Sequence, residues 1–317
     1  MKTLKQKDLL SLLSVQAESG DTDVMQEHVS SLCRSLGARV ESDTIGNLYV
    51  TKGATSDGFP CVVAHLDTVH NIYTGTLLPL VIGDNVTGFD PESMAQVGIG
   101  GDDKCGIWVA LKTLEATPCI KLAFFVDEEV GCVGSGACDM SFFDDVNFVL
   151  QADRRGRSDF VTDISGGLSS KAFQKAVKPL ITEFGYKFSP GGMTDVQELR
   201  DRGVGVSVAN MSTGYYHPHS DREYINLPDL ERTCQLVRAL CSTLVGRFPF
   251  TPRKPTHTKW VPPVSPPQKH KSSLDQVWAD WERTKYVPDP YDDLDAAIEY
   301  EESKKYLKFY TPPKNDF

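Results

Sequence analysis

The feature that most restricts the fold of this chain is a repeated unit in which a short apolar run ends in acidic residues. Cys61–Ala64 runs into an H-x-D triplet, Ile120–Val126 runs into three consecutive acids, and Phe148–Gln151 is followed by an alanine and an aspartate. Apolar runs of this length, without alternating polar residues, are typical of strands buried on both faces. Such strands must be covered by other elements, which indicates a layered fold around a buried sheet.

Segments with helical patterns separate these runs. Asp8–Leu36 predicts a helix in two pieces, broken at Ser19–Asp21, where Asp21 or Thr22 can cap the second piece. Further helices are expected at Lys104–Glu115, Ser169–Phe184 and Leu227–Leu244, and further strands at Asn47–Thr51, Leu78–Ile82 and Val204–Val208. Strands that alternate with helices predict an α/β protein with a largely parallel or mixed sheet, in which ligands bind at the carboxyl ends of strands.

Charge and proline content divide the 317 residues into two parts. The chain has 33 basic and 43 acidic residues, and residues 251–317 hold 11 of each, so residues 1–250 carry the whole net charge of −10. The C-terminal part also holds 10 of the 19 prolines and 3 of the 4 tryptophans. We expect a globular body at 1–250, a Pro-rich basic linker or strap at 251–273, and an aromatic, acidic extension at 274–317 with a helix at 292–307.

Several classes of protein are disfavoured by the same composition. An acidic body does not offer the basic face that nucleic acids require, and no segment approaches the roughly 20 apolar residues of a membrane helix. The Leu-rich N-terminus superficially resembles a signal peptide, but Asp8 interrupts it and no cleavage site follows, so an amphipathic helix is expected. The eight cysteines form no C-x-x-C pair, and reduced thiols in a cytoplasmic protein are expected.

Polar residues that could carry chemistry cluster after the apparent strands. His65 and Asp67 are two residues apart, so they face the same side of an extended chain, where the carboxylate could orient a metal-bound imidazole. Asp102 and Asp103 follow a glycine-rich turn that opens a helix; they could be aimed inward or could simply cap that helix. Acids at the position of a phosphate argue against a phosphate-binding loop.

The acids after the next two strands are harder to explain as solvated surface. Glu128 and Glu129 belong to the three consecutive acids beside the core, where carboxylates repel one another unless a cation or a shared proton compensates. Asp153 ends a further strand, and His217 and His219 lie in a tyrosine-rich segment. Imidazoles and carboxylates without cysteine ligands favour zinc, cobalt or manganese, and the set suffices for two ions that share a bridging carboxylate.

These five segments resemble, in content and order, those of the co-catalytic zinc exopeptidases that include peptidase T and the bacterial aminopeptidases. The family carries H-x-D, G-x-D-D-K-x-G, D-E-E-x-G, a strand-end Asp and H-x-x-x-E, and the resemblance spans about residues 25–244. It implies a three-layer single domain with a mixed, largely parallel central sheet flanked by helices, followed by an irregular C-terminal extension. It also implies two divalent metal ions, most simply zinc.

The resemblance assigns a role to each matching residue. It implies that His65 and Asp153 are ligands of the first metal and that Asp67 orients His65. Asp102 corresponds to the bridging carboxylate, with Asp103 beside it at the helix start. Glu128 corresponds to the general base, which activates a water that bridges the metals, and Glu129 corresponds to a ligand of the second metal. His219 precedes Glu223 by four residues, as the family pattern requires, and is preferred over His217 as the last ligand.

Two intervals depart from the family pattern. Asp153 and His219 are 66 residues apart, too few for the lid domain of peptidase T-like members, and Asp67 and Asp102 are 35 residues apart, too few for the insertion of another branch. We therefore expect a lid-less member. The segment 189–195 could form a wall of the substrate pocket or a surface turn, and His217, Tyr215 or Tyr216 could polarise the substrate carbonyl.

The resulting functional prediction is hydrolysis of a peptide or small amide by a metal-dependent aminopeptidase. A dipeptidase or N-acyl amino acid deacylase with the same metal site is the first alternative. An inactive scaffold that acts through its C-terminal tail is the second, and the complete ligand set argues against it. The tail itself could strap the body through its aromatic residues or bind partners, including an SH3-like groove. No feature indicates an oligomer.

Overall fold

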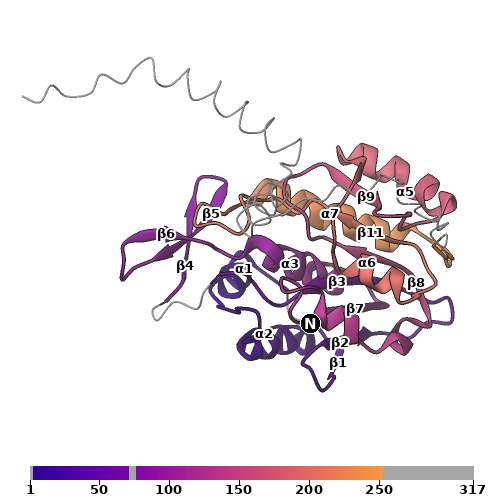
Figure 1. Ribbon diagram of the computed structural model, residues 1–317, viewed down its shortest axis with the longest axis horizontal. Coiled ribbons are helices and arrows are strands. Elements are labelled where there is room, and N and C mark those ends of the chain that lie inside the picture. The colour runs from indigo at the N-terminus through magenta and orange to yellow at the C-terminus, as the bar shows by residue number, and fades with distance from the viewer. Residues whose placement is uncertain (1–2, 71–75, 253–317) are drawn as a thin grey trace, which may run out of the picture. The chain divides into compact units, whose positions relative to one another are not determined.

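The computed structural model describes residues 3–70 and 76–252 (Figure 1). Its helices are α1 (Gln6–Leu13), α2 (Asp23–Ser35), α3 (Gly101–Ala116), α4 (Val133–Ala137), the 3-10 helix η1 (Met140–Phe143), α5 (Lys171–Glu183), α6 (Asp195–Asp201) and α7 (Leu227–Thr243). Its strands are β1 (Arg39–Ser42), β2 (Leu48–Lys52), β3 (Phe59–His65), β4 (Leu78–Ile82), β5 (Asn85–Asp90), β6 (Ala95–Val97), β7 (Ile120–Phe125), β8 (Val146–Gln151), β9 (Asp159–Asp163), β10 (Lys187–Pro190), β11 (Val208–Met211), β12 (Tyr215–Tyr216) and β13 (Tyr224–Asn226).

Eight strands form the central sheet, in the order β1-β2-β7-β3-β8-β11-β9-β10. The four strands in the middle, β7, β3, β8 and β11, run parallel to one another. The pairs β1–β2, β2–β7 and β11–β9 are antiparallel, so the sheet is mixed. Because the carboxyl ends of the parallel strands share one edge, the polar residues that follow them are brought together there.

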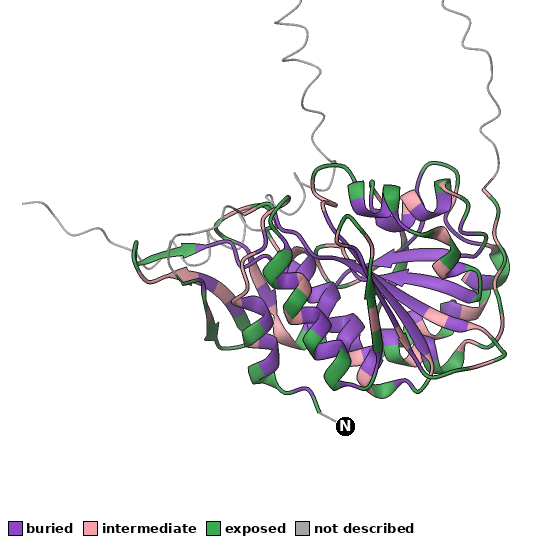
Figure 2. Ribbon diagram, turned by 90° about the horizontal axis from the view of Figure 1, so that it is seen from below, coloured by how far each residue is buried: buried purple, intermediate pink, exposed green. Residues whose placement is uncertain are grey.

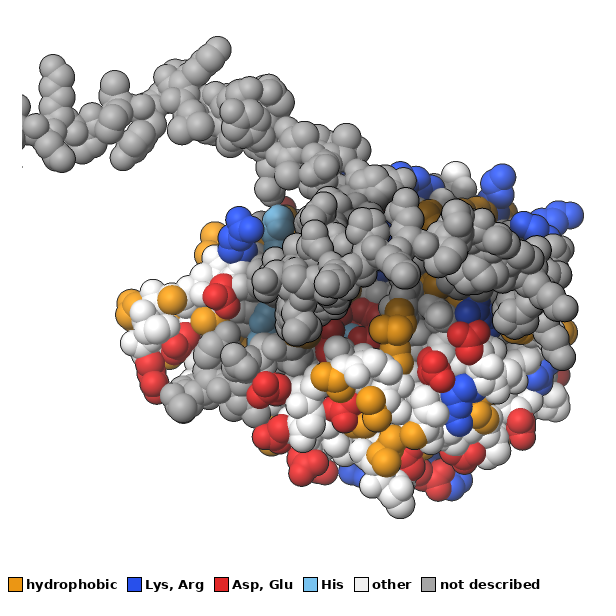
Figure 3. All heavy atoms as spheres, viewed as in Figure 1, with side chains coloured by type: hydrophobic (Ala, Val, Ile, Leu, Met, Phe, Trp, Pro, Cys, Tyr) orange, Lys and Arg blue, Asp and Glu red, His pale blue; other side chains and the backbone are white. Residues whose placement is uncertain are grey.

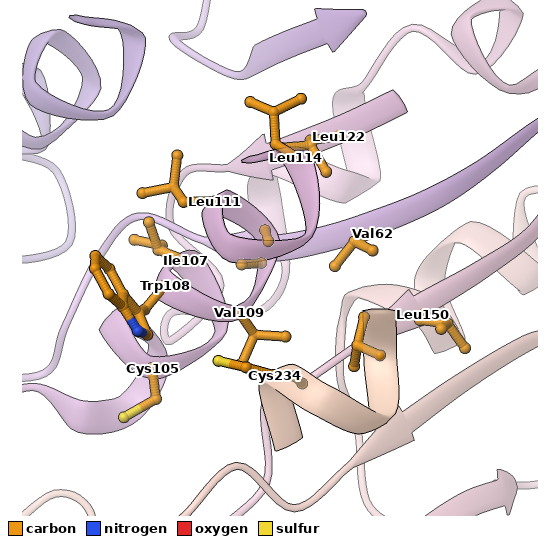
Figure 4. Packing of buried hydrophobic residues seen from close by; sticks show 14 of the residues in the cluster. Val62, Cys105, Ile107, Trp108, Val109, Leu111, Leu114, Leu122, Leu150 and Cys234 are labelled. Atoms are coloured by element: carbon orange, nitrogen blue, oxygen red, sulfur yellow. The ribbon is translucent and has the colours of Figure 1, made fainter. Parts of the chain in front are cut away.

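Helices cover both faces of this sheet. Val62, Leu122 and Leu150 pack into a core on the side of α1, α2, α3, α5 and α7 (Figure 4). Side chains of alternate residues, such as Val63 and Val149, pack into a second core on the side of η1 and α6. The strands are therefore buried on both faces, as Figure 2 shows, which explains their lack of polar alternation. The predicted three-layer α/β fold is confirmed.

One predicted strand is misplaced. The segment Val204–Val208 is not a strand; β11 begins at its last residue, Val208. Gly205 has a φ of +74°, and Val206 makes only an isolated bridge with Pro249. The backbone N–H of Ser207 donates to the Phe248 carbonyl, and the Ser207 carbonyl accepts from Val149 in β8, so this residue joins the central sheet to the chain that leaves α7. At the start of α2, Thr22 is the N-cap residue, but its hydroxyl accepts from the Gln26 side chain and makes no side-chain cap bond.

A second, smaller sheet was not foreseen beyond its strand β4. Its strands follow the order β12-β13-β5-β4, and β6 pairs with the far end of β5. The interval between Asp67 and Asp102 thus supplies β4, β5 and β6, which extend away from the central sheet in Figure 1. The interval between Asp153 and His219 holds β9, α5, β10, α6, β11 and β12.

The described residues belong to one compact unit. The predicted linker, the aromatic extension and the helix at 292–307 lie outside the described residues, apart from Thr251 and Pro252. Within the described part of the chain, no helix combines the length and apolar character that crossing a bilayer requires.

Candidate metal centre

The predicted site residues meet at the carboxyl edge of the parallel strands. His65 ends β3, the acids at 127–129 follow β7, and Asp153 follows β8; these three strands are neighbours in the sheet. Asp102 lies at the start of α3, and His219 lies in the loop after β12. Figure 3 shows carboxylate and imidazole side chains together near the middle of this face of the molecule.

His65 is the centre of the first group of donor atoms. Its Nε2 lies 3.1 Å from Asp102 Oδ1 and 3.7 Å from Asp153 Oδ1, and its side chain is completely buried. Its Nδ1 lies 2.9 Å from the backbone carbonyl oxygen of Asp67, which can only accept a hydrogen bond. In the neutral ring, Nε2 therefore presents a lone pair to two carboxylates, an arrangement that requires a proton or a cation between them.

Asp102 connects this group to a second one. Its other oxygen, Oδ2, lies 3.4 Å from Nε2 of His219, and the same Nε2 lies 3.1 Å from Glu129 Oε1. Asp102 thus faces a His–Asp group with one oxygen and a His–Glu group with the other. This is the arrangement expected of a carboxylate that bridges two metal ions.

Asp67 contacts both His65 and the turn that follows β7. Its carboxylate Oδ1 is 3.4 Å from His65 Nδ1, whereas its backbone carbonyl makes the shorter contact described above. The carboxylate also accepts the backbone N–H groups of Glu128, at 3.0 Å, and Glu129, at 3.3 Å. It also accepts the hydroxyl of Ser19 at 2.7 Å. Although burial opposes ionisation, the bonds from His65, Ser19 and the Glu128 backbone lower the pKa of Asp67 to about 2.

Asp103 fixes the start of α3, because both of its carboxylate oxygens accept backbone hydrogen bonds. It is fully buried, its Oδ1 accepts the Gly106 backbone N–H at 2.9 Å, and its Oδ2 accepts that of His65 at 3.3 Å. A Cβ at Gly106 would lie 2.3 Å from Asp103 Oδ1, which explains why glycine stands there. The turn into the helix is made by Gly100, the N-cap, with a φ of +66°. The Asp102–Asp103 peptide bond is cis.

The electrostatics of the cluster show excess negative charge. Burial and the neighbouring Asp102 raise the pKa of Asp153 to about 7, and burial together with Asp153, Asp195 and Glu129 raises the pKa of Glu128 to about 9. Hydrogen bonds with Asp102 and Glu129 raise the pKa of His219 to about 10. Burial opposes the charge on His65, but hydrogen bonds to Asp102, Asp153 and Asp67 raise its pKa well above the usual value. Carboxylates that share protons in this way need compensating positive charge.

The donor set fits divalent metal ions. One ligand atom each from His65, Asp102 and Glu129 lie within 4.8 Å of one another, as do those from His65, Asp103 and Asp153. Both oxygens of Asp103 accept backbone N–H groups, whereas the two oxygens of Asp102 face the imidazoles of His65 and His219. Imidazole nitrogen and carboxylate oxygen suit zinc, and also manganese or cobalt.

A network that the sequence did not reveal supports Asp153. Its Oδ2 accepts the Thr194 hydroxyl at 3.0 Å and the Gln151 amide at 3.3 Å, and its Oδ1 accepts the Tyr215 hydroxyl at 3.2 Å. Its backbone N–H donates to Asn210 Oδ1 at 3.0 Å. Single polar residues in separate elements carry no spacing signal, so only the fold could place them here.

Two further residues clarify the segments around the site. Glu223, fully buried, accepts the backbone N–H groups of Gly100 at 2.7 Å and Asp102 at 3.1 Å, which fixes the loop that presents the bridging carboxylate. The sequence indicated this residue only as the glutamate of the H-x-x-x-E pattern that begins at His219. Asp195, also buried, accepts from Ser135 Oγ at 2.6 Å and from Gln151 at 3.1 Å. Within the segment 189–195, Thr194 and Asp195 are buried beside the site, whereas Pro190, Gly192 and Met193 are exposed.

The three residues considered for carbonyl polarisation occupy different surroundings. Tyr215 is buried with its hydroxyl at Asp153, whereas the Tyr216 hydroxyl donates to Asp229 Oδ2 at 2.6 Å. The His217 ring centroid lies 5.8 Å from that of Tyr224. Of the three, Tyr215 is the one whose hydroxyl contacts a proposed metal ligand.

Three solved structures with a similar fold are peptidases, each at 18% identity or less to this chain. Aminopeptidase PepT from Bacillus cereus has a TM-score of 0.62 at 16% identity, with 75% of this chain and 97% of that chain covered. A tripeptidase from Staphylococcus aureus has a TM-score of 0.59 at 14% identity, covering 74% and 96%. An aminopeptidase from the archaeon Desulfurococcus kamchatkensis has a TM-score of 0.58 at 18% identity, covering 75% and 94%.

Sequence comparison gives the family. No curated protein matches the chain, but the sequence pattern of peptidase family M28 matches residues 47–241, which include every residue of the candidate site. Because the match covers more than half of the 317 residues, the chain belongs to peptidase family M28, and the predicted resemblance to the co-catalytic zinc exopeptidases is confirmed.

Proposed function

We propose that the protein is a metallopeptidase with two metal ions, most simply zinc, that removes residues from the free N-terminus of peptides. The observation that carries the proposal is the position of Asp102, whose two carboxylate oxygens face two separate imidazole–carboxylate pairs. His65 and Asp153 would hold one ion, and Glu129 and His219 would hold the other. Two ions bound there would supply Lewis acidity to the substrate carbonyl and lower the pKa of a water molecule.

Glu128 is the proposed general base. Asp67 fixes the backbone of Glu128 beside that of the ligand Glu129, so the two side chains share one rigid turn. Glu128 is not one of the proposed metal ligands. Its proposed role is to take a proton from the attacking water and then to donate that proton to the leaving amine. Without bound ions, burial and the neighbouring acids raise the pKa of Glu128 to about 9; the positive charge of two metal ions would lower this pKa and leave a carboxylate that can accept the proton.

Cleavage at a free N-terminus is favoured by the charge of the site. Five carboxylates, those of Asp67, Asp102, Glu128, Glu129 and Asp153, surround the centre, and such a site attracts the ammonium group of a peptide N-terminus. The proposal of an aminopeptidase is also supported by the similar solved structures, two of which are aminopeptidases and one a tripeptidase. The eight thiols, seven of them buried, suit a reducing compartment, and we propose a cytoplasmic location.

The proposal is tested first by Glu128→Ala, measured together with metal content. We expect both ions to be retained and turnover of a leucyl peptide to fall by about 10³-fold, the usual contribution of a general base. The matched control is Asp127→Ala, which removes the adjacent acid, whose Oδ1 accepts only the Gly20 backbone N–H at 2.7 Å. Full activity in the Glu128 variant would exclude this mechanism.

Substrate class is tested with two sets of amides. Aminoacyl amides carry a free ammonium group and should be cleaved, whereas N-acyl amino acids should resist. Cleavage of the N-acyl amino acids alone would replace the aminopeptidase proposal with the deacylase alternative. Cleavage of dipeptides but not of aminoacyl amides would replace it with the dipeptidase alternative.

A further inference from the structure

The outer part of the second sheet carries an unusual concentration of exposed apolar side chains. Of 13 large apolar residues exposed in the described part of the chain, four belong to the five-residue strand β4: Leu78, Leu80, Val81 and Ile82, with Ile82 65% exposed. Figure 3 shows apolar side chains on this projecting part of the molecule. An apolar patch of this kind on a soluble protein marks an interaction surface.

The free edge of β4 is not the part of this surface suited to binding. Ile82 and Asn85 flank the two-residue turn between β4 and β5 and form a directly paired position, so their backbone groups bond inward. By alternation, Pro79 and Val81 turn their backbone groups outward, and proline has no N–H to offer. Pro79 therefore disfavours the pairing of another strand with the edge of β4. A ligand of β4 would instead contact the face of the sheet.

One face of the sheet joins β4 to the metal centre. The register places Tyr216 opposite Tyr224, Tyr224 opposite Thr87, and Thr87 opposite Leu80, so these four side chains form one row across four strands. The Tyr216 and Tyr224 rings are stacked at 5.0 Å, and the ring of His217, two residues before the proposed ligand His219, lies 5.8 Å from Tyr224. The row thus begins at the loop that supplies His219.

The opposite face of β12, β13 and β5 belongs to the core. Tyr215, Ile225 and Val86 form the neighbouring row and are all buried. Leu78, Leu80 and Ile82 lie on the outer face with the row of Tyr216 and Tyr224, because alternate residues of a strand share a face. At β4 itself both faces reach solvent, since Val81, in the row of Val86, is 43% exposed. Only the face of Leu80 continues through the half-buried Tyr224 and Tyr216 toward the loop of His219.

We propose that this face, defined by Tyr216, Tyr224, Thr87, Leu80 and Ile82, binds the part of a peptide substrate that lies beyond the cleaved bond, and selects peptides with apolar residues there. The inference rests on the proposed function and names its substrate class. Strands are about 4.8 Å apart, so the row spans about 14 Å, the length of about four extended residues. The preferred substrate is therefore a peptide of about six residues or more.

The experiment compares three substrates with the same N-terminal leucine: leucinamide, Leu-Gly-Gly-Leu-Phe-Leu and Leu-Gly-Gly-Ser-Ser-Ser. We expect the apolar hexapeptide to have a kcat/KM about tenfold above that of the serine hexapeptide, mainly through KM. The double variant Leu80→Ser/Ile82→Ser should remove this advantage and leave leucinamide turnover unchanged. Val81→Ser is the matched control: it changes the same strand on its other face and should keep the advantage.

Two results would overturn the inference. One is an equal kcat/KM for both hexapeptides in the wild-type protein. The other is a double variant that loses leucinamide and hexapeptide turnover alike and changes from dimer to monomer in sedimentation velocity. The second result would show that a second copy of the chain covers this face.

A binding measurement separates this inference from the proposed function. Fluorescence anisotropy of the labelled apolar hexapeptide is measured with Glu128→Gln alone and combined with Leu80→Ser/Ile82→Ser. An affinity for the hexapeptide that falls about tenfold in the combined variant supports the docking face. This conclusion holds even if the wild-type protein hydrolyses no peptide, a result that would reject the proposed function alone. Hydrolysis without any dependence of binding on Leu80 and Ile82 leaves the proposed function intact and rejects the docking face.

Discussion

Asp67 joins both halves of the catalytic cluster through a single side chain. The H-x-D spacing predicted that its carboxylate orients His65. In the structure the Asp67 carboxylate lies 3.4 Å and the Asp67 backbone carbonyl 2.9 Å from His65 Nδ1, and the carboxylate also bonds to the backbone of Glu128 and Glu129. Each oxygen of the Asp67 carboxylate accepts hydrogen bonds. In asparagine an NH₂ group, which can only donate, would replace one of these oxygens and face an N–H or O–H donor.

Asp67→Asn should therefore lower the free energy of unfolding by about 2 kcal/mol, because it disrupts hydrogen bonds to a buried charge. Turnover should fall while metal content is retained, because Glu128 loses its fixed position. Urea denaturation and metal analysis measure the two effects. Ser19→Ala removes only one donor to Asp67 and should have a smaller effect on both; an equal effect would contradict the role assigned to the Glu128 backbone contact.

Tyr186 gives a test of pH dependence away from the metal centre. Its hydroxyl contacts Thr233 Oγ1 at 2.6 Å and donates to the Ser212 carbonyl at 3.0 Å, and burial raises its pKa from 10.0 to about 12. The folded state thus holds the proton more tightly than the unfolded state, so this contribution to stability is complete below pH 10 and is lost as the pH rises to about 12.

The loss should amount to about 1 kcal/mol for each pH unit in that interval. Tyr186→Phe should lower stability at pH 8 by about 1 kcal/mol, because two hydrogen bonds are removed, and should show a flatter decline above pH 10. Urea denaturation at several pH values compares the two proteins. Parallel curves for the wild-type protein and the variant would contradict the assignment.

At the scale of elements, the start of α3 determines where the carboxylate of Asp102, the proposed bridging ligand, lies. Gly106→Ala would place a Cβ 2.3 Å from Asp103 Oδ1 and force that carboxylate away from the His65 and Gly106 backbones. We expect a loss of about 2 kcal/mol in stability and weaker metal binding, measured by denaturation and by titration with zinc. Gly136→Ala is the control, because its Cβ would meet Glu198 Oε1 at 3.8 Å, an ordinary contact; an equal loss there would refute the explanation.

The main elements were predictable because their sequence patterns are long and consistent. Leu227–Leu244 and Ile120–Val126 were predicted to within about one residue of α7 and β7. The second sheet was missed because β12 has two residues and β13 and β6 have three each, too few to show a period of two. Its pairing depends on chain segments far apart in sequence, such as Tyr224 with Thr87.

At the scale of the whole molecule, the crowded carboxylates link metal binding to stability. Without metal ions, the buried groups of Asp102, Asp153 and Glu128 repel one another or bind protons. Treatment with a chelator should lower the Tm by about 10 °C, measured by calorimetry, and zinc should restore it. Glu128→Ala, which removes no proposed ligand, should show the same metal-dependent rise. No change in Tm on chelation would argue against the metal centre.

The role of residues 253–317 stays a prediction, because they lie outside the described residues. We expect them to strap the body through their aromatic side chains, so a chain truncated after Pro252 should have a lower Tm and unchanged metal content. An unchanged Tm would favour partner binding by the tail. The predicted boundaries at 250 and 273 are tested by limited proteolysis, which should cut first within 251–273.

The α/β class, the family and the residues that gather at the metal centre could all be predicted from the amino-acid sequence. Acids and histidines directly after buried strands are costly unless a cation compensates them, and the carboxyl ends of parallel strands meet at one edge. Three other features emerged only from the folded chain: the Asp67 carboxylate holds the Glu128 turn, Thr194 and Tyr215 support Asp153, and the outer sheet continues to the active-site loop. These contacts join segments far apart in the chain, and no local pattern of residues records such distances.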